Sequence, residues 1–323
     1  MHKIKSFSRE DKNAVWNLMN KVQRYRNFEA VTKRLPSIPT EPEWVWLGHI
    51  LANPECRIAL KGALSDAPYI PLQASDLDRL YSNPLVQALI KNVEPGSLAE
   101  DILALDQDCK GEDLIEKLRR LGVQGVDSWA KDLWGALGRY DDFEDFYIEG
   151  KYARKWAISG LDVQLKPCGK KGPDVRVSKD GEHIFVEVTR LREDELLAEK
   201  QREAGQRGEL IEIPITTQQI YSKILGEYHQ LIRGAANAIL VHSDSSVKEG
   251  FDFRRMVPYI REEILHDTTL HSRVNAFIFY DKWGIDSKGT YCCVFVNKHA
   301  VCPLPDHFLI KIATALDHGV EFV

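Results

Sequence analysis

The sequence predicts an α/β domain over residues 141–323, preceded by an all-α domain over residues 1–140. The first part reads as helices separated by proline and glycine. Short runs rich in β-branched residues, typical of strands, begin at Leu161. Six of the seven tryptophans precede position 157, so the first part has its own aromatic residues for a core. A chain of 323 residues is long enough for two such domains.

The composition is that of a soluble globular protein, with 44% hydrophobic and 28% charged residues. No stretch approaches the roughly 18 apolar residues that cross a bilayer, so we expect a cytoplasmic location and no membrane partner. The six cysteines form no CxxC pair, and no two of the ten histidines share a helix face at i, i+3 or i, i+4 spacing. We therefore expect reduced thiols and no zinc site.

The charge is unevenly distributed along the chain. Its net value is −5, which gives no overall attraction to a phosphate backbone. Residues 1–34, however, contain nine basic and three acidic side chains. This segment indicates an anionic partner bound locally, and the alternative is a solvated basic helix face.

The helices of the first part begin with recognisable caps. Residues 8–11, 40–43 and 97–100 each have the capping-box pattern that satisfies unpaired amides at a helix start. In the second part, six strands are expected at residues 161–165, 175–177, 184–188, 238–241, 276–280 and 291–296. Helices are expected at residues 142–157, 218–233, 251–266 and 306–317, with a helix and a loop over residues 192–208.

A hairpin in the second part carries the chemistry. Asp180 and Gly181 form a strong two-residue turn signal between two alternating strands. If Lys179 lies opposite Glu182, then Val175 faces Val186 on one apolar side of the hairpin.

The same register places Asp174 directly across from Glu187 on the polar side. Two facing carboxylates destabilise a sheet unless they share a proton, meet a cation or bind a metal. Mg²⁺ prefers carboxylate, carbonyl and water oxygens, so the pair suits Mg²⁺ or Mn²⁺. The alternative is a purely structural acidic pair neutralised by nearby arginines.

The helix expected at residues 142–157 adds a third acid. Its inward stripe contains Phe146, Tyr152 and Trp156, and Glu149 falls inside this stripe. A carboxylate among inward aromatic residues needs a partner, which the polar side of the hairpin would provide. Glu144 lies on another face of the helix and is the reserve candidate. The alternative is a glutamate at the stripe's edge that reaches solvent.

Taken in order, these pieces resemble the PD-(D/E)XK phosphodiesterase superfamily, the restriction-endonuclease-like nucleases, over roughly residues 141–245. The matching elements are the helical Glu149, a first strand, Gly-Pro-Asp174, Val-Glu187-Val-Thr and a helix with Lys223 before an apolar strand. The resemblance implies a central mixed sheet flanked by helices. It also implies Asp174, Glu187 and the backbone carbonyl of Val188 as Mg²⁺ ligands, assisted by Glu149.

The sequence departs from this family at one position, because Thr189 stands where the motif has lysine. Threonine carries no positive charge and can only donate a hydrogen bond to phosphate or water. In an active enzyme another lysine would fill the role. Lys223 is the first choice, followed by Lys170 and Lys171 in the loop before Asp174.

The expected function is a metal-dependent nuclease, with Asp174, Glu187, Glu149, Thr189 and Lys223 as catalytic residues and Mg²⁺ or Mn²⁺ as cofactor. The alternative is an inactive nuclease fold that binds protein or nucleic acid; a purely structural protein without metal is the third hypothesis. We expect a nucleic-acid partner, DNA before RNA, and a protein partner on the helical domain. Pairing into a homodimer is a further expectation.

Overall fold

The computed structural model describes residues 4–26, 53–65, 74–91, 97–191, 217–243, 253–267, 272–281, 291–316 and 320–322. The chain forms two compact units. The helical unit comprises Met1–Asp113 and Leu133–Phe143, and the sheet unit comprises Leu114–Asp132 and Glu144–Val323. The boundary expected from the sequence, between residues 140 and 141, falls at the start of a helix that runs from Tyr140 to Ile158.

The described residues before position 160 are mainly helical. Ser8 caps the first long helix, because the amide of Asp11 donates to its Oγ at 3.0 Å, as the capping pattern predicted. The capping pattern at residues 40–43 lies outside the described residues. The elements are η1 (Ile4–Ser6), α1 (Arg9–Arg26), α4 (Pro54–Ser65), α5 (Ala74–Ser82), α6 (Pro84–Lys91), α7 (Ser97–Arg120), α8 (Val126–Gly135) and α9 (Tyr140–Ile158).

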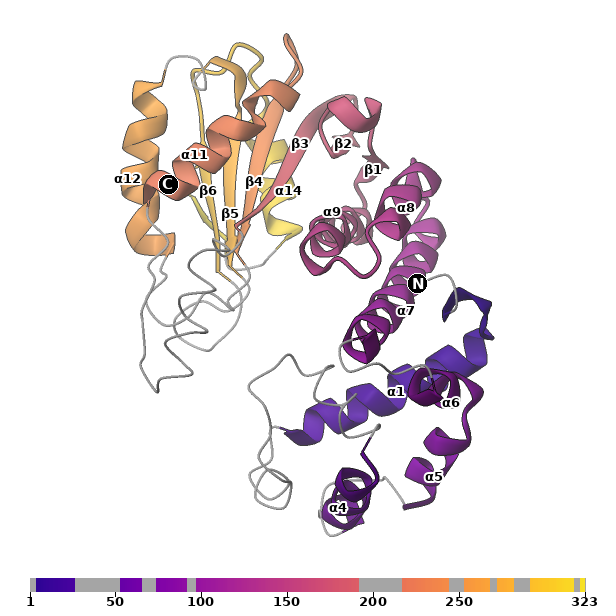
Figure 1. Ribbon diagram of the computed structural model, residues 1–323. Coiled ribbons are helices and arrows are strands. Elements are labelled where there is room, and N and C mark those ends of the chain that lie inside the picture. The colour runs from indigo at the N-terminus through magenta and orange to yellow at the C-terminus, as the bar shows by residue number, and fades with distance from the viewer. Residues whose placement is uncertain are drawn as a thin grey trace. The chain divides into compact units, whose positions relative to one another are not determined.

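The sheet unit is a mixed α/β structure, and all six expected strands are present (Figure 1). Its strands are β1 (Asp162–Leu165), β2 (Val175–Lys179), β3 (Glu182–Leu191), β4 (Asn237–Ser243), β5 (Ala276–Asp281), β6 (Tyr291–Val296) and the two-residue β7 (Glu321–Phe322), in sequential order. The pairs β1/β2, β2/β3 and β5/β6 are antiparallel, whereas β3/β4, β4/β5 and β6/β7 are parallel. The remaining elements are η2 (Gly169–Lys171), α11 (Thr217–Glu227), η3 (Tyr228–Gln230), α12 (Phe253–His266) and α14 (Asp306–Thr314).

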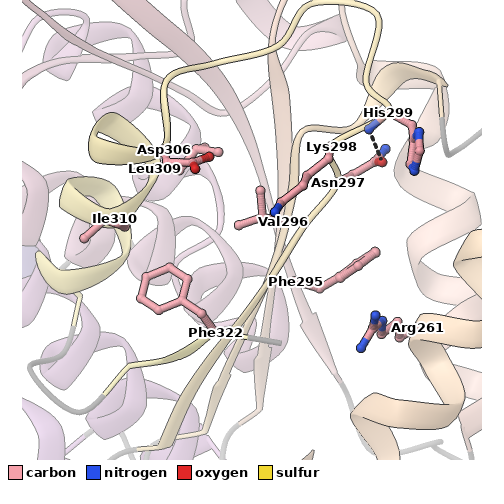
Figure 2. A pocket seen from close by; sticks show the side chains of 10 residues that line it. All are labelled: Arg261, Phe295, Val296, Asn297, Lys298, His299, Asp306, Leu309, Ile310 and Phe322. Atoms are coloured by element: carbon pink, nitrogen blue, oxygen red, sulfur yellow. Dashed lines mark hydrogen bonds between the residues drawn. The ribbon is translucent and has the colours of Figure 1, made fainter.

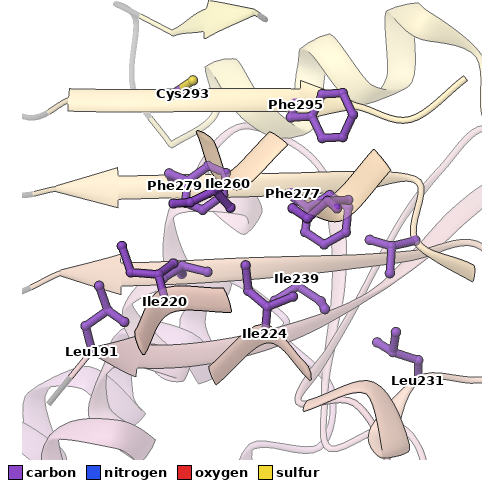
Figure 3. Close-up of a cluster of buried hydrophobic side chains, with 13 residues drawn as sticks. Leu191, Ile220, Ile224, Leu231, Ile239, Ile260, Phe277, Phe279, Cys293 and Phe295 are labelled. Atoms are coloured by element: carbon purple, nitrogen blue, oxygen red, sulfur yellow. The ribbon is translucent and has the colours of Figure 1, made fainter. Parts of the chain in front are cut away.

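Helices cover both faces of this sheet. On one face α11 and α12 pack against β4, β5 and β6, and the apolar cluster that joins them includes Ile220, Ile239, Ile260 and Phe277, all 0% exposed (Figures 1 and 3). Burial of such side chains is the main force that holds helix to sheet.

On the opposite face, α9 contacts both the sheet and α14. Tyr152 Oη lies 2.6 Å from His242 Nδ1 on β4, and Lys155 Nζ donates to Tyr280 Oη on β5 at 2.7 Å. The indole of Trp156 donates to the carbonyl of Ile312 on α14 at 3.1 Å. These bonds satisfy polar groups buried under the helix and fix its position on the sheet.

A turn between α7 and α8 extends the sheet beside β1. The amide of Gln124 donates to the carbonyl of Val163, and the amide of Leu165 donates to the carbonyl of Gln124, both at 2.9 Å. The next residue is Gly125, with φ of +74°, and a Cβ atom there would lie 2.1 Å from the carbonyl oxygen of Leu165. This position therefore requires glycine both for its backbone conformation and for the close approach.

Two helix ends differ from expectation. The helix expected over residues 218–233 ends at Glu227 and continues as the short η3, and the last helix ends at Thr314 rather than at 317. The segment 192–208 lies outside the described residues. Among the described helices, none combines the length and the apolar character that crossing a membrane requires.

Candidate active site

The β2/β3 hairpin has the register that the sequence predicts. Val175 pairs with Val186, and Lys179 pairs with Glu182. At the turn, Asp180 has φ of +53° and Gly181 has φ of +91°. Two successive positive φ angles are typical of the type I′ turn, whose twist suits a hairpin.

Asp174 lies just outside this hairpin ladder, which ends at the pair of Val175 with Val186. The predicted direct pairing of Asp174 with Glu187 is therefore not formed as a ladder pair. Asp174 Oδ2 instead accepts the amide of Val188 at 3.0 Å, and Oδ1 accepts Lys166 Nζ at 2.6 Å. Both carboxylates are nevertheless buried, with 5% of Asp174 and 3% of Glu187 exposed.

Glu149 faces inward from α9, as its stripe of aromatic neighbours predicted, and is 5% exposed. Its carboxylate meets Lys166, whose Nζ lies 3.0 Å from Oε2. Burial and the nearby charge of Asp174 raise the pKa of Glu149 well above its usual value, while Lys166 acts in the opposite direction. The partner of Glu149 is therefore Lys166, which follows β1 and also contacts Asp174 beside the hairpin.

Lys166, directly after β1, is a site residue that the sequence analysis does not predict, as is Glu227 on α11. The ammonium group of Lys166 lies between Glu149 and Asp174, and its own amide donates to the carbonyl of Asp174 at 2.7 Å. Burial alone would lower the pKa of Lys166, but the two carboxylates outweigh it and raise this pKa above its usual value. Leu165 pairs with Val175, so the antiparallel register places Lys166 opposite Asp174. That register is the signal that could have found it.

Glu187 is the acid with the least compensation. Burial, followed by the charges of Asp174 and Glu227, raises the pKa of Glu187 to about 11. Within the described part of the chain, its Oε2 atom is buried and has no hydrogen-bond partner. A buried carboxylate oxygen without a donor is costly, so this atom calls for a proton or a cation.

Thr189 and Lys223 both meet a fourth acid, Glu227 on α11. Thr189 Oγ1 donates to Glu227 Oε1 at 2.9 Å, and Gln230 Nε2 donates to Glu227 Oε2 at 2.9 Å. Lys223 Nζ lies 3.4 Å from Glu227 Oε1, with 43% of its side chain exposed. The structure thus brings Lys223 to Glu227, and its assignment as the replacement lysine stays a prediction.

Of the other predicted residues, Val188 contacts the site through its amide, which donates to Asp174. The role of its carbonyl as a metal ligand stays a prediction. Glu144 is half-buried on α9, and Lys171 is exposed in η2. Neither is among the contacts of Asp174, Glu149 or Lys166 described above.

The described residues do not form a ready-made metal centre, because no group of three or more His, Cys, Asp or Glu side chains in them is arranged to hold an ion. Lys166 occupies the space between Glu149 and Asp174 and supplies a positive charge there. The donor set still fits a hard divalent ion, since Asp174 and Glu187 offer carboxylate oxygens and one of these has no donor. No protein-family profile, curated protein or solved structure matches the chain.

A separate pocket of about 590 Å³ lies around β6 and α14, far along the strand order from β2 and β3 (Figure 2). Its lining includes the basic Arg261 and Lys298, the acidic Asp306 and the aromatic Phe295 and Phe322. None of the predicted site residues lines this pocket. The acidic cluster and the pocket are therefore separate features of the sheet unit.

Proposed function

We propose that the sheet unit is a metal-dependent nuclease of the restriction-endonuclease-like type, hydrolysing phosphodiester bonds with Mg²⁺ or Mn²⁺. The observation that carries the proposal is the buried, unpartnered Oε2 of Glu187 beside the buried Asp174. Taking several carboxylates out of water is costly unless their charge is neutralised. A divalent ion neutralises two such charges at once.

The order of elements supports this proposal. A helix carrying Glu149 is followed by three antiparallel strands, then by α11, then by β4 parallel to β3. This is the order that the resemblance to the PD-(D/E)XK superfamily implies. The likeness rests on order, register and acidic residues together.

In this proposal Asp174 and Glu187 hold the ion, the carbonyl of Val188 adds a ligand, and Glu149 assists from α9. When bound, the ion supplies Lewis acidity and neutralises charge that develops on the phosphate. The hydroxyl of Thr189 donates a hydrogen bond to Glu227, so we assign Thr189 the role of orienting that carboxylate. Hydrogen-bonded groups around a metal site hold its ligands in position.

The proposed substrate is nucleic acid, DNA before RNA. With a net charge of −5, the chain depends on local basic groups for its attraction to phosphates. The basic residues 1–34 are the candidates, which gives the helical unit the role of substrate or partner recognition. This role predicts an affinity for nucleic acid that falls as salt rises.

The test compares the full chain with the isosteric variant Asp174→Asn. Purified protein is incubated with DNA and with RNA in Mg²⁺, in Mn²⁺ or in EDTA. We expect cleavage only with metal, and a loss of about 10³-fold in Asp174→Asn, because several kcal/mol of charge stabilisation depend on the ion. Absence of any cleavage, or full activity in Asp174→Asn, contradicts the proposal.

A second function is favoured by two observations. Thr189 replaces the motif lysine, and Lys166 already lies between Glu149 and Asp174. A fold that keeps its acids neutralised by an internal lysine would serve as a nucleic-acid- or protein-binding subunit. Salt-sensitive binding of DNA without cleavage, unchanged by Asp174→Asn, would favour this function over the nuclease.

A further inference from the structure

We infer that Lys166 supplies the positive charge that Thr189 cannot, and that it releases Asp174 when a divalent ion binds. The inference rests on the proposed nuclease function and deepens it. It assigns the stabilisation of transition-state charge to a residue outside the Asp174, Glu187 and Thr189 motif. In the metal-free protein the same residue occupies Asp174 and so competes with a metal ion for it.

The contacts of Lys166 give the first step. Its Nζ lies 2.6 Å from Asp174 Oδ1 and 3.0 Å from Glu149 Oε2, with 10% of the side chain exposed. The amine also lies 5.3 Å from the centroid of the Phe146 ring. A cation enclosed by two carboxylates and an aromatic ring interacts more strongly than an exposed one.

The backbone of Lys166 gives the second step. Its φ is +47°, a left-handed conformation that non-glycine residues rarely adopt. Among the described residues, Asp180 in the hairpin turn is the other non-glycine with positive φ. Strained backbone of this kind persists where the surroundings fix it, and it is concentrated at functional sites. Here the amide of Lys166 is fixed by the carbonyl of Asp174, at 2.7 Å.

The two hydrogen bonds that the Asp174 carboxylate accepts give the third step. Lys166 Nζ binds its Oδ1, and the amide of Val188 binds its Oδ2. An ion that binds Asp174 would lie close to this ammonium group, and the two positive charges would repel each other. The Val188 amide is fixed within β3, whereas lysine has a flexible four-carbon stem. Metal binding and release of the ammonium group are thus linked, and the released group is available to a phosphate.

The experiment uses the full chain and the variants Lys166→Met, Lys223→Met and Lys298→Met. Lys298 is exposed beyond β6 and serves as the matched control. Mn²⁺ affinity is measured by calorimetry without nucleic acid, and cleavage is measured at saturating Mn²⁺. For Lys166→Met we expect at least about tenfold tighter Mn²⁺ binding, since a competing like charge is removed. Its cleavage should fall about 10²-fold or more, the effect of removing one transition-state donor.

Lys298→Met should match the wild type in both assays. Unchanged Mn²⁺ affinity or unchanged cleavage in Lys166→Met overturns the inference, as does a loss of cleavage confined to Lys223→Met. If the wild type does not cleave, the proposed function fails. The catalytic role of Lys166 fails with it, and the competition between Lys166 and the ion is then judged by affinity alone. Tighter Mn²⁺ binding in Lys166→Met supports this competition, and its absence overturns it.

Removing one cation from a buried cluster can also disturb folding. The double variant Glu149→Gln with Lys166→Met removes one negative and one positive charge together, and its fold is checked by circular dichroism. A folded double variant should still lose cleavage relative to the single variant Glu149→Gln. Equal cleavage in these two proteins overturns the inference.

Discussion

Lys12 in the helical unit and Lys166 in the sheet unit are both largely buried beside carboxylates, and they differ in what surrounds them. Lys12 Nζ lies 2.7 Å from Asp108 Oδ2 and 3.0 Å from Glu112 Oε1, two acids one turn apart on α7. With 34% of its side chain exposed, Glu112 is partly hydrated.

The acids around Lys166 come from separate elements. Glu149 belongs to α9 and Asp174 precedes β2, while Glu187 on β3 and Glu227 on α11 add two further carboxyl groups nearby. Among the described residues, Glu149 and Glu187 each have a buried oxygen without a hydrogen-bond partner, and that of Glu149 lies 3.0 Å from Lys166 Nζ. The first cluster thus has the form of a structural ion pair, whereas the second has more buried carboxyl groups than cations, an imbalance that a bound ion would relieve.

Replacing Lys12 should give the largest change in stability. In Lys12→Met, Asp108 stays buried without its cation, so we expect a loss of about 3 kcal/mol, the usual cost of removing one partner of a buried pair. Urea denaturation of the variant measures this loss. If the cluster is only structural, Mn²⁺ affinity of the folded variant stays at the wild-type value, and a changed affinity would contradict the distinction between the two lysines.

Replacing Glu187 should raise the stability of the metal-free protein instead of lowering it. Its pKa is raised from 4.5 to about 11 in the folded chain, so between these values the unfolded state ionises while the folded state retains the proton. This group therefore destabilises the metal-free fold increasingly as pH rises above about 4.5. Glu187→Gln cannot ionise, and we expect it to stabilise the metal-free protein by about 1–3 kcal/mol at pH 8.

Near pH 4 the same substitution should have little effect, because Glu187 is protonated in both states. Urea denaturation in EDTA at the two pH values measures the difference. Glu182→Gln, on the same strand but half-buried, is the control. If the stabilisation by Glu187→Gln does not grow with pH, Glu187 is ionised in the folded protein and a nearby cation, not a proton, neutralises it.

The smallest effect is expected at Thr189. Thr189→Val keeps the shape of the side chain but removes the 2.9 Å hydrogen bond to Glu227. The expected loss of stability is about 1 kcal/mol, typical of a single hydrogen bond. Thermal denaturation measures it, with Ser178→Ala on β2 for comparison. A loss of cleavage similar to that of Asp174→Asn would instead mean that Thr189 acts on the substrate.

The strands and the hairpin could be predicted because their determinants are local. The turn at Asp180 and Gly181 fixes one register, and alternation then places every side chain of the two strands. Glu149 followed from helix periodicity in the same way. Lys166 and Glu227 did not follow, since Lys166 depends on the pairing of β1 with β2, and Glu227 depends on how α11 packs on β3. Neither relation is encoded by a short pattern.

The position of Lys166 also depends on Gly125, which lies far from it in the sequence. A single methyl group there would meet the carbonyl oxygen of Leu165, the residue immediately before Lys166. The end of β1 would have to shift, and the ammonium group that follows it would shift too. Substitutions in the turn between α7 and α8 can therefore shift the acidic cluster without changing any of its residues. Gly125 thus belongs to the positions on which the geometry of the site depends.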